Sequence, residues 1–139
     1  MSSPPPAAAS TVIPEPLRTF LAAPRFATIA TIGLDGSPHQ AVVWYALDGD
    51  TLYINSRRER RWPQNLERDG RINVAVHDHE KLGHWVGLRG AAEVVRTGEA
   101  AIEDIASMAR RYGGDPEGFK GQDRITFAVR IERIYEYWS

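Results

Sequence analysis

The stretch RFATIATIGLDGSPHQAVVWYALDGDTLYINS, residues 25–56, decides the fold of this chain. Its apolar residues alternate with polar ones and are rich in β-branched and aromatic types, which is typical of half-buried strands. Two turn signals, DG at 35–36 and DGD at 48–50, divide the stretch into strands over residues 26–33, 39–47 and 51–56. Three strands joined by tight turns predict an antiparallel meander with no crossover helix.

The remainder of the chain predicts three more strands and two or three short helices. Strand alternation returns at residues 71–78, 84–96 and 124–138, and Gly87 and Gly90 inside the second of these predict bulges or a barrel corner. Helical spacing or composition occurs at residues 15–23, 59–68 and 99–112. Six antiparallel strands with a few helices predict a mainly β (α+β) fold built as a small barrel.

The composition fits one domain and excludes several classes of function. With 17 basic and 18 acidic residues the net charge is −1, which argues against a nucleic-acid partner. The absence of cysteine excludes disulfides, Cys-ligated metals and thiol nucleophiles. The Pro/Ala/Ser-rich residues 1–12 are expected to be a disordered tail before a domain at 13–139. We see no membrane-spanning run and no signal peptide, so we expect a cytoplasmic protein with no membrane partner.

The basic residues are concentrated at one place. Fifteen of the 17 are Arg, and six of these lie between Arg57 and Arg71. The run SRRERR, residues 56–61, lies where a predicted strand ends and a predicted helix begins. A hydroxyl, free backbone N–H groups and the positive end of a helix would meet there, and each favours a phosphate oxygen that Arg can bind bidentately. The competing interpretation is a solvated basic turn, which is the usual fate of charge runs.

The remaining motifs give little support for a catalytic side chain or a metal site. His77, His79 and His84 are spaced like metal ligands, but no fourth ligand converges on them, and a polar strand end explains them more simply. His39 has no partner that would make it a general base. There is no nucleophile elbow, no P-loop and no dinucleotide fingerprint. We therefore predict no metal and assign no catalytic residue.

Several short motifs, taken in order, resemble the pyridoxamine 5′-phosphate oxidase-like split-barrel flavoproteins. The motifs are RFATIATIGLDGSP at 25–38, VVWY at 42–45, GDTLYINS at 49–56, NLERDGR at 65–71, WVGLRGAAEV at 85–94 and ARRYGG at 109–114. They extend over about 115 residues from Leu17 onward, and their order is more specific than any one of them. The class that they resemble most is the actinobacterial group of coenzyme F420-dependent enzymes. Gly70 replaces the proline that is usual in the fourth motif.

The resemblance implies a six-stranded antiparallel split β-barrel that forms a homodimer and binds FMN or the deazaflavin F420 between subunits. It implies that the cofactor phosphate is held by the Ser56 hydroxyl and the Arg60 guanidinium. It also implies that the cofactor ring runs beside Val42, Val43 and Trp44, with Trp85 and Arg89 near the dimer groove. The full set of candidate cofactor-binding residues includes five more: Asn55, Arg57, Arg58, Arg61 and Trp62.

One position departs from the pattern of the family. Two residues after Arg60 the family often has a Lys, whereas this chain has Trp62. Three explanations remain open. Arg57, Arg58 or Arg61 supplies the missing charge, or the phosphate is held more weakly, or the cofactor differs.

The function that we expect is that of an oxidoreductase. It would transfer a hydride from reduced coenzyme F420 to an unsaturated small molecule, while the protein orients the ring. An FMN-binding oxidase or reductase and a non-catalytic flavin- or deazaflavin-binding protein are the alternatives. A single-stranded nucleic-acid module is a third, and the net charge disfavours it.

Overall fold

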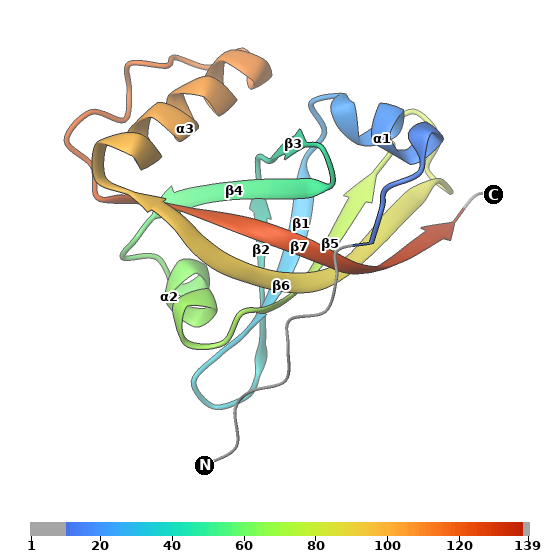
Figure 1. The fold of residues 1–139 in the computed structure, drawn as a ribbon, viewed down its shortest axis with the longest axis horizontal. Helices are drawn as coiled ribbons and strands as arrows, with labels where there is room; N and C mark the ends of the chain where they lie inside the picture. Colours follow the sequence, from blue (N-terminus) through green and yellow to red (C-terminus); the bar gives the residue numbers. More distant parts are fainter. Residues whose placement is uncertain (1–10, 138–139) are drawn as a thin grey trace.

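The computed structural model describes residues 11–137, which form three helices and seven strands (Figure 1). In chain order these are α1 (Glu15–Ala22), β1 (Ala27–Ile32), β2 (Pro38–Val43), β3 (Ala46–Asp48), β4 (Thr51–Arg57), α2 (Arg61–Arg68), β5 (Arg71–His77), β6 (Trp85–Thr97), α3 (Gly98–Tyr112) and β7 (Arg124–Tyr137). Most of the predicted tail, residues 1–10, lies outside the described residues. Trp138, in the last predicted strand, also lies outside them. Within residues 11–137 no helix is long and apolar enough to cross a membrane.

The seven strands form one antiparallel sheet in the order β2-β1-β5-β6-β7-β4-β3. Its two edge strands, β2 and β3, are separated in the chain by Trp44 and Tyr45 alone. The sheet therefore curls until its edges approach each other, and β1 and β2 run across β4 and β7 (Figure 1). No ladder joins β2 to β3 in the described part of the chain, so the sheet is bent and open.

These findings confirm a mainly β, antiparallel fold with three helices and correct the expected barrel in two respects. The predicted strand at 39–47 is two strands, which makes seven in all, and the sheet is not closed. The predicted meander is only partly right: both tight turns join antiparallel neighbours, β1 with β2 and β3 with β4, but β4 pairs with β7 on its other side and does not pair with β2. The physical reason is that the chain leaves the sheet at Tyr45, whose ring is fully buried.

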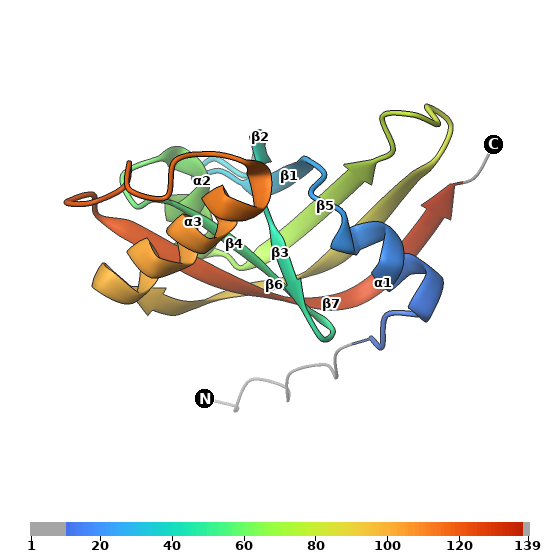
Figure 2. The ribbon, with the colours of Figure 1, turned by 90° about the horizontal axis from the view of Figure 1, so that it is seen from above.

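Tyr45 and Arg111 join the break in the sheet to the helices. The Tyr45 hydroxyl donates to the carbonyl of Leu21 at 2.9 Å, and burial raises its pKa to about 12. Arg111, in the last turn of α3, donates to the carbonyls of Ala22 and Ala23 at 3.1 and 2.9 Å. A cation at the carboxyl end of α1 is stabilising, because the backbone carbonyls there have no partners within the helix. Figure 2 shows α3 and α1 toward opposite ends of β6 and β7.

The core lies inside the bend of the sheet. Alternate side chains of the strands point into it, and the largest fully buried ones include Ile29, Leu52, Ile54, Leu88 and Phe127. The buried face of α1 adds Leu17 and Leu21 to this core. Each such side chain contributes about 1.5–3 kcal/mol of burial free energy, so the core outweighs any single polar contact described below.

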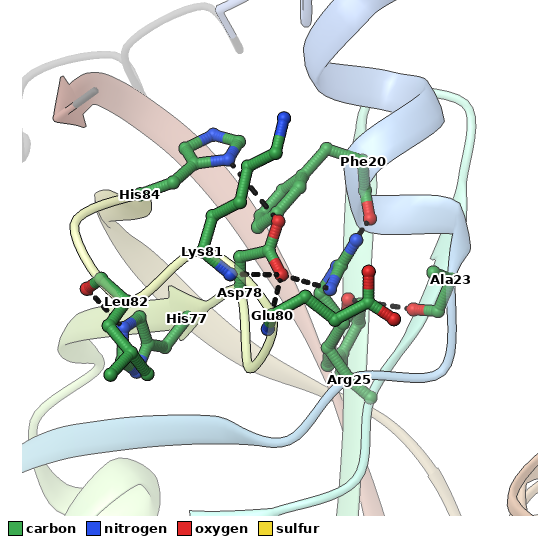
Figure 3. A network of polar contacts seen from close by, with 10 residues as sticks. Phe20, Ala23, Arg25, His77, Asp78, Glu80, Lys81, Leu82 and His84 are labelled. Atoms are coloured by element: carbon green, nitrogen blue, oxygen red, sulfur yellow. Dashed lines mark hydrogen bonds and ion pairs between the residues drawn. The ribbon is translucent and has the colours of Figure 1, made fainter. Parts of the chain in front are cut away.

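Asp78 ties the β5–β6 turn to the segment that leads into β1 (Figure 3). Its Oδ1 accepts the backbone N–H groups of Glu80 and Lys81 at 2.9 and 3.2 Å and lies 3.6 Å from Nη1 of Arg25. Its Oδ2 lies 3.5 Å from Nδ1 of His84. The hydrogen bond from Glu80 is the main reason that the pKa of Asp78 lies below its ordinary value of 3.8. This network fixes the backbone immediately before Phe26.

The register of β6 against β7 shifts at Gly90, where Glu132 is the extra residue of a bulge. The expected bulge at Gly90 is thereby confirmed, whereas the ladder passes Gly87 without a shift. The hydroxyl of Thr11 donates to the carbonyl of Glu132 at 2.9 Å, so the bulged residue keeps a partner. A Cβ at Gly90 would overlap the backbone carbonyl of Arg130, whereas a Cβ at Gly87 would meet only side chains.

We expect Gly90→Ala to destabilise the protein by about 1–3 kcal/mol, because the obstacle is backbone that cannot move without opening the β6–β7 ladder. Gly87→Ala on the same strand is the matched control, and it should cost less because side chains can rotate away. Urea denaturation of both variants measures the difference. Equal costs for the two substitutions would contradict this account of the bulge.

Asp78→Asn should lower the free energy of unfolding near neutral pH and remove part of its dependence on pH. Because the folded pKa lies below 3.8, the contribution of Asp78 is fully present above that value and is lost as pH falls through the lowered pKa. The difference between native and variant protein should therefore stay constant down to about pH 5 and shrink progressively from there to about pH 2. Thermal unfolding across this range checks it, with Glu80→Gln in the same turn as control. A difference that stays constant with pH would contradict the assignment.

Candidate functional site

A cavity of about 280 Å³ opens where the end of β2 meets the start of α2 and the loop after α3. It is lined by Phe26, Val42, Val43, Trp44, Asn55, Arg60, Trp62, Ile105, Phe119 and Arg124. Larger hollows of about 530 and 470 Å³ lie along the sheet face near Arg89. We place the candidate site in the smaller cavity because it combines flat aromatic surfaces with two arginines.

Two of the rings that line the cavity, those of Trp44 and Phe26, stack on the ring of Tyr112 behind them, and these three rings are here called the aromatic wall. The rings of Trp44 and Tyr112 lie 5.1 Å apart and within 7° of parallel. Phe26 also stacks on Tyr112, at 5.9 Å and 26°. The Tyr112 hydroxyl accepts the backbone N–H of Tyr45 at 3.2 Å and donates to the carbonyl of Arg25, so the position of this ring is fixed by two hydrogen bonds. Such a fixed apolar surface suits a flat ring system.

Arg124, the first residue of β7, also lines the cavity. Its side chain is buried, with 5% of the residue exposed, and burial lowers its pKa to about 10, helped by repulsion from Arg60 and Arg57. Its Nε donates to Oδ1 of Asn55 at 3.0 Å. The Asn55 amide is itself oriented, because its Nδ2 donates to the carbonyl of Ala101 and to Oγ1 of Thr126, each at 2.8 Å. The guanidinium is therefore positioned and remains charged at neutral pH.

The arginines of residues 57–71 differ in whether a carboxylate neutralises them. Three of them are neutralised by carboxylates, in the pairs Arg57–Glu59 at 2.8 Å, Arg58–Glu67 at 2.7 Å and Arg71–Asp69 at 2.7 Å. Among the described residues, neither Arg60 nor Arg124 forms an ion pair with a carboxylate. Two guanidiniums without carboxylate partners at one cavity create a positive potential that favours an anion. The N-terminal end of α2 adds to this positive potential, because no side chain caps the free backbone N–H groups of its first turn.

Half of the predicted cofactor-binding residues line this cavity, namely Val42, Val43, Trp44, Asn55, Arg60 and Trp62. Trp62 has a second role, because its ring is buried and packs at 5.9 Å from that of Phe127. The position where the family often has a Lys is therefore a core position in this chain. A cation does reach the cavity, but it comes from Arg124 on β7.

The other six predicted residues lie elsewhere. The Ser56 hydroxyl is buried and donates to the carbonyl of Arg57 at 3.0 Å. Arg57 and Arg58 are engaged in the ion pairs described above. Arg61 lines a separate hollow between α2 and the β1–β2 hairpin, and Trp85 and Arg89 line the hollow on the sheet face. Their part in cofactor binding stays a prediction.

Sequence reasoning missed four residues of the cavity: Phe26, Ile105, Phe119 and Arg124. Arg124 is 69 positions from its partner Asn55, and nothing in the local sequence joins them. The β4–β7 register does so, since it places Arg57 opposite Arg124 and Asn55 opposite Thr126. The histidines contribute no metal site that we can identify. Nε2 of His77 lies 2.7 Å from the carbonyl of Leu82, and residues 11–137 contain no cluster of three metal-ligating side chains.

Comparison with known proteins agrees with this architecture. The family model described as pyridoxamine 5′-phosphate oxidase matches residues 13–138. Among curated proteins, none matches this chain in sequence. An F420 reductase is 24% identical with a TM-score of 0.76, over 88% of this chain and 98% of that one.

Two further solved structures share the fold. A conserved hypothetical protein from Mycobacterium tuberculosis is 24% identical with a TM-score of 0.75, over 94% of this chain and 88% of that one. The heme storage protein HutZ from Vibrio cholerae is 20% identical with a TM-score of 0.72, over 88% and 94% of the two chains. At these identities the resemblance is one of fold.

Proposed function

The chain belongs to the pyridoxamine 5′-phosphate oxidase family, and we propose that it is an oxidoreductase that binds coenzyme F420 in the cavity beside Arg60 and Arg124. The reaction is transfer of a hydride from the reduced ring to an unsaturated small molecule. The observation that carries this proposal is the pair of guanidiniums without carboxylate partners, which line the same cavity as Trp44 and Phe26 of the aromatic wall. The likeness in fold to an F420 reductase supports it.

The residues of the cavity divide the work between binding and orientation. Arg60 and Arg124 hold the phosphate, and Asn55 keeps Arg124 in place. Trp44 and the end of β2 lie beside the cofactor ring. The stack of Trp44 on Tyr112 keeps the Trp44 side chain in a fixed orientation. The bound deazaflavin supplies the hydride chemistry, so the protein's contribution is to position the ring and to keep water from its reacting face.

The same residues fit FMN, the alternative cofactor, because its phosphate would meet the same two guanidiniums. They fit heme less well. None of the ten residues that line the cavity is a His, Tyr, Met or Cys, so this surface offers heme iron no side-chain ligand. This difference favours a flavin-like cofactor although several proteins of the same fold bind heme.

We also propose that the protein acts as a homodimer. A cavity of about 280 Å³ lies just below the range of about 300–1,000 Å³ that is usual for small-molecule sites. Val42 and Phe26 at its edge are 70% and 50% exposed, so the site of one chain is only partly enclosed. Trp85 and Tyr137 stack at 4.2 Å on the sheet face while 36% and 49% exposed. A second copy of the chain would cover this apolar surface and complete the site.

The first test is titration with F420 and with FMN, followed by the fluorescence of the ring. Arg60→Ala and Arg124→Met should each weaken binding by about 1.5–3 kcal/mol, which is the range for a hydrogen bond to a charged group. Arg58→Ala is the matched control from the same cluster, and its affinity should match that of the native protein because Glu67 already neutralises Arg58.

If neither F420 nor FMN binds, the proposed function is refuted. Equal losses in all three variants would show that only net charge matters and would remove the assigned site. If F420 binds but its reduced form is not oxidised by simple enones or quinones, the protein is a carrier and not a reductase.

The dimer is tested by sedimentation velocity. The native protein should sediment as a dimer, and Trp85→Glu should shift it toward monomer and weaken cofactor binding, because a charge then lies in the proposed interface. Leu34→Glu is the control, since Leu34 is also apolar and is more exposed than Trp85, but lies in the β1–β2 hairpin turn. A monomeric native protein that binds cofactor at full affinity would overturn this part of the proposal.

A further inference from the structure

The connection between α3 and β7, residues 113–123, has neither helix nor strand and carries Phe119 into the lining of the cavity. A glycine in the left-handed region stands near each end, Gly113 with φ 77° and Gly121 with φ 81°. These are the backbone angles that other residues rarely adopt, so the two positions can act as hinges. Elsewhere the connection folds on itself, because the N–H of Glu117 binds Oδ1 of Asp115 and the N–H of Gln122 binds the carbonyl of Phe119.

Within residues 11–137, the polar and ring contacts that join the interior of this connection to the body of the protein go to Arg124. The Arg124 guanidinium lies 5.2 Å from the centre of the Phe119 ring. Its Nη1 donates to Oε1 of Gln122 at 2.9 Å. Backbone hydrogen bonds hold the two ends, from Gly114 to Ala109 and from Arg58 to Asp123. The segment between them therefore depends on where the Arg124 guanidinium lies.

Arg124 faces the cavity and the connection at the same time. A guanidinium has five N–H donors, and the two hydrogen bonds to Asn55 and Gln122 account for two of them. The others can bind an anion without displacing either partner. An anion would also offset the repulsion from Arg60 and Arg57, which otherwise disfavours the charged guanidinium at this place. Occupancy of the cavity should therefore strengthen the contacts that hold the connection down.

We propose that residues 113–123 form a lid over the cavity, fastened by Phe119 and Gln122 to Arg124, and that an anionic ligand at Arg124 closes it. The lid rests on the proposed anion site, but it does not depend on which cofactor binds there. Its role is specificity and exclusion of water, because Phe119 lines the cavity and would cover part of a ligand bound there.

The chain offers an internal control for measuring the lid. It has two lysines, Lys120 in the lid and Lys81 in the β5–β6 turn, and both are exposed. A lysine-specific endoprotease therefore cuts only at these two places. Cleavage of a loop requires local opening, so the rate at Lys120 relative to Lys81 reports how often the lid opens.

In the protein without ligand, Phe119→Ala should raise the relative cleavage rate at Lys120 by about 5- to 30-fold, because the contact with the guanidinium is lost. Phe119→Tyr keeps the ring and should behave like the native protein. Phe119 is partly exposed, so neither variant should unfold. Equal rates in all three proteins would overturn the proposed fastening.

Saturating FMN should slow cleavage of the native protein at Lys120 by at least about fivefold and leave Lys81 unchanged. If FMN binds, as its fluorescence shows, and Lys120 is not protected, the lid is refuted while the proposed function stands. If neither FMN nor F420 binds, the proposed function fails. The lid is then tested by the Phe119 variants and by adding inorganic phosphate at constant ionic strength. If phosphate does not slow cleavage at Lys120, the lid is refuted.

Discussion

The two-residue connection between β2 and β3 is the constraint on which the rest of the structure depends. These strands are the two edges of the sheet, so Trp44 and Tyr45 can join them only if the sheet curls through its full width. Tyr45 makes the connection rigid, because its ring is fully buried and its hydroxyl is bonded to the end of α1. Trp44 is thereby left at the open edge, where it stacks on Tyr112 and forms the side of the cavity.

Electrostatics then decides what this cavity can bind. Six arginines lie within residues 57–71, yet three are neutralised by neighbouring carboxylates. The potential at the cavity comes from Arg60 together with Arg124, which reaches it from the other end of the chain. Burying a cation without a carboxylate costs stability, and here the hydrogen bond that Arg124 donates to Asn55 offsets part of that cost. A site that is strained without its ligand is typical of functional positions in proteins.

Because the sheet is open, the candidate site lies next to surface on which a second copy of the chain could pack. A curled sheet that does not close leaves one face and one edge exposed, and both carry apolar or aromatic side chains beside the cavity. An unpaired surface of this kind favours association, and the partly enclosed cavity lies at its margin. The proposed cofactor site, the proposed dimer and the position of the loop after α3 would therefore be linked through the same few residues.

The sequence by itself determined the mainly β character with three helices, the bulge at Gly90 and the family, because alternation, turn residues and motif order are local properties of the chain. It also identified Arg60 and the residues of β2 that line the cavity. Only the tertiary structure decided that residues 39–47 break into two edge strands, that Trp62 is a core residue and that Arg124 supplies the second cation. Each of these three features follows from how the strands pair across the sheet. The register that places Arg57 opposite Arg124 depends on how the whole sheet bends, and no local pattern records it.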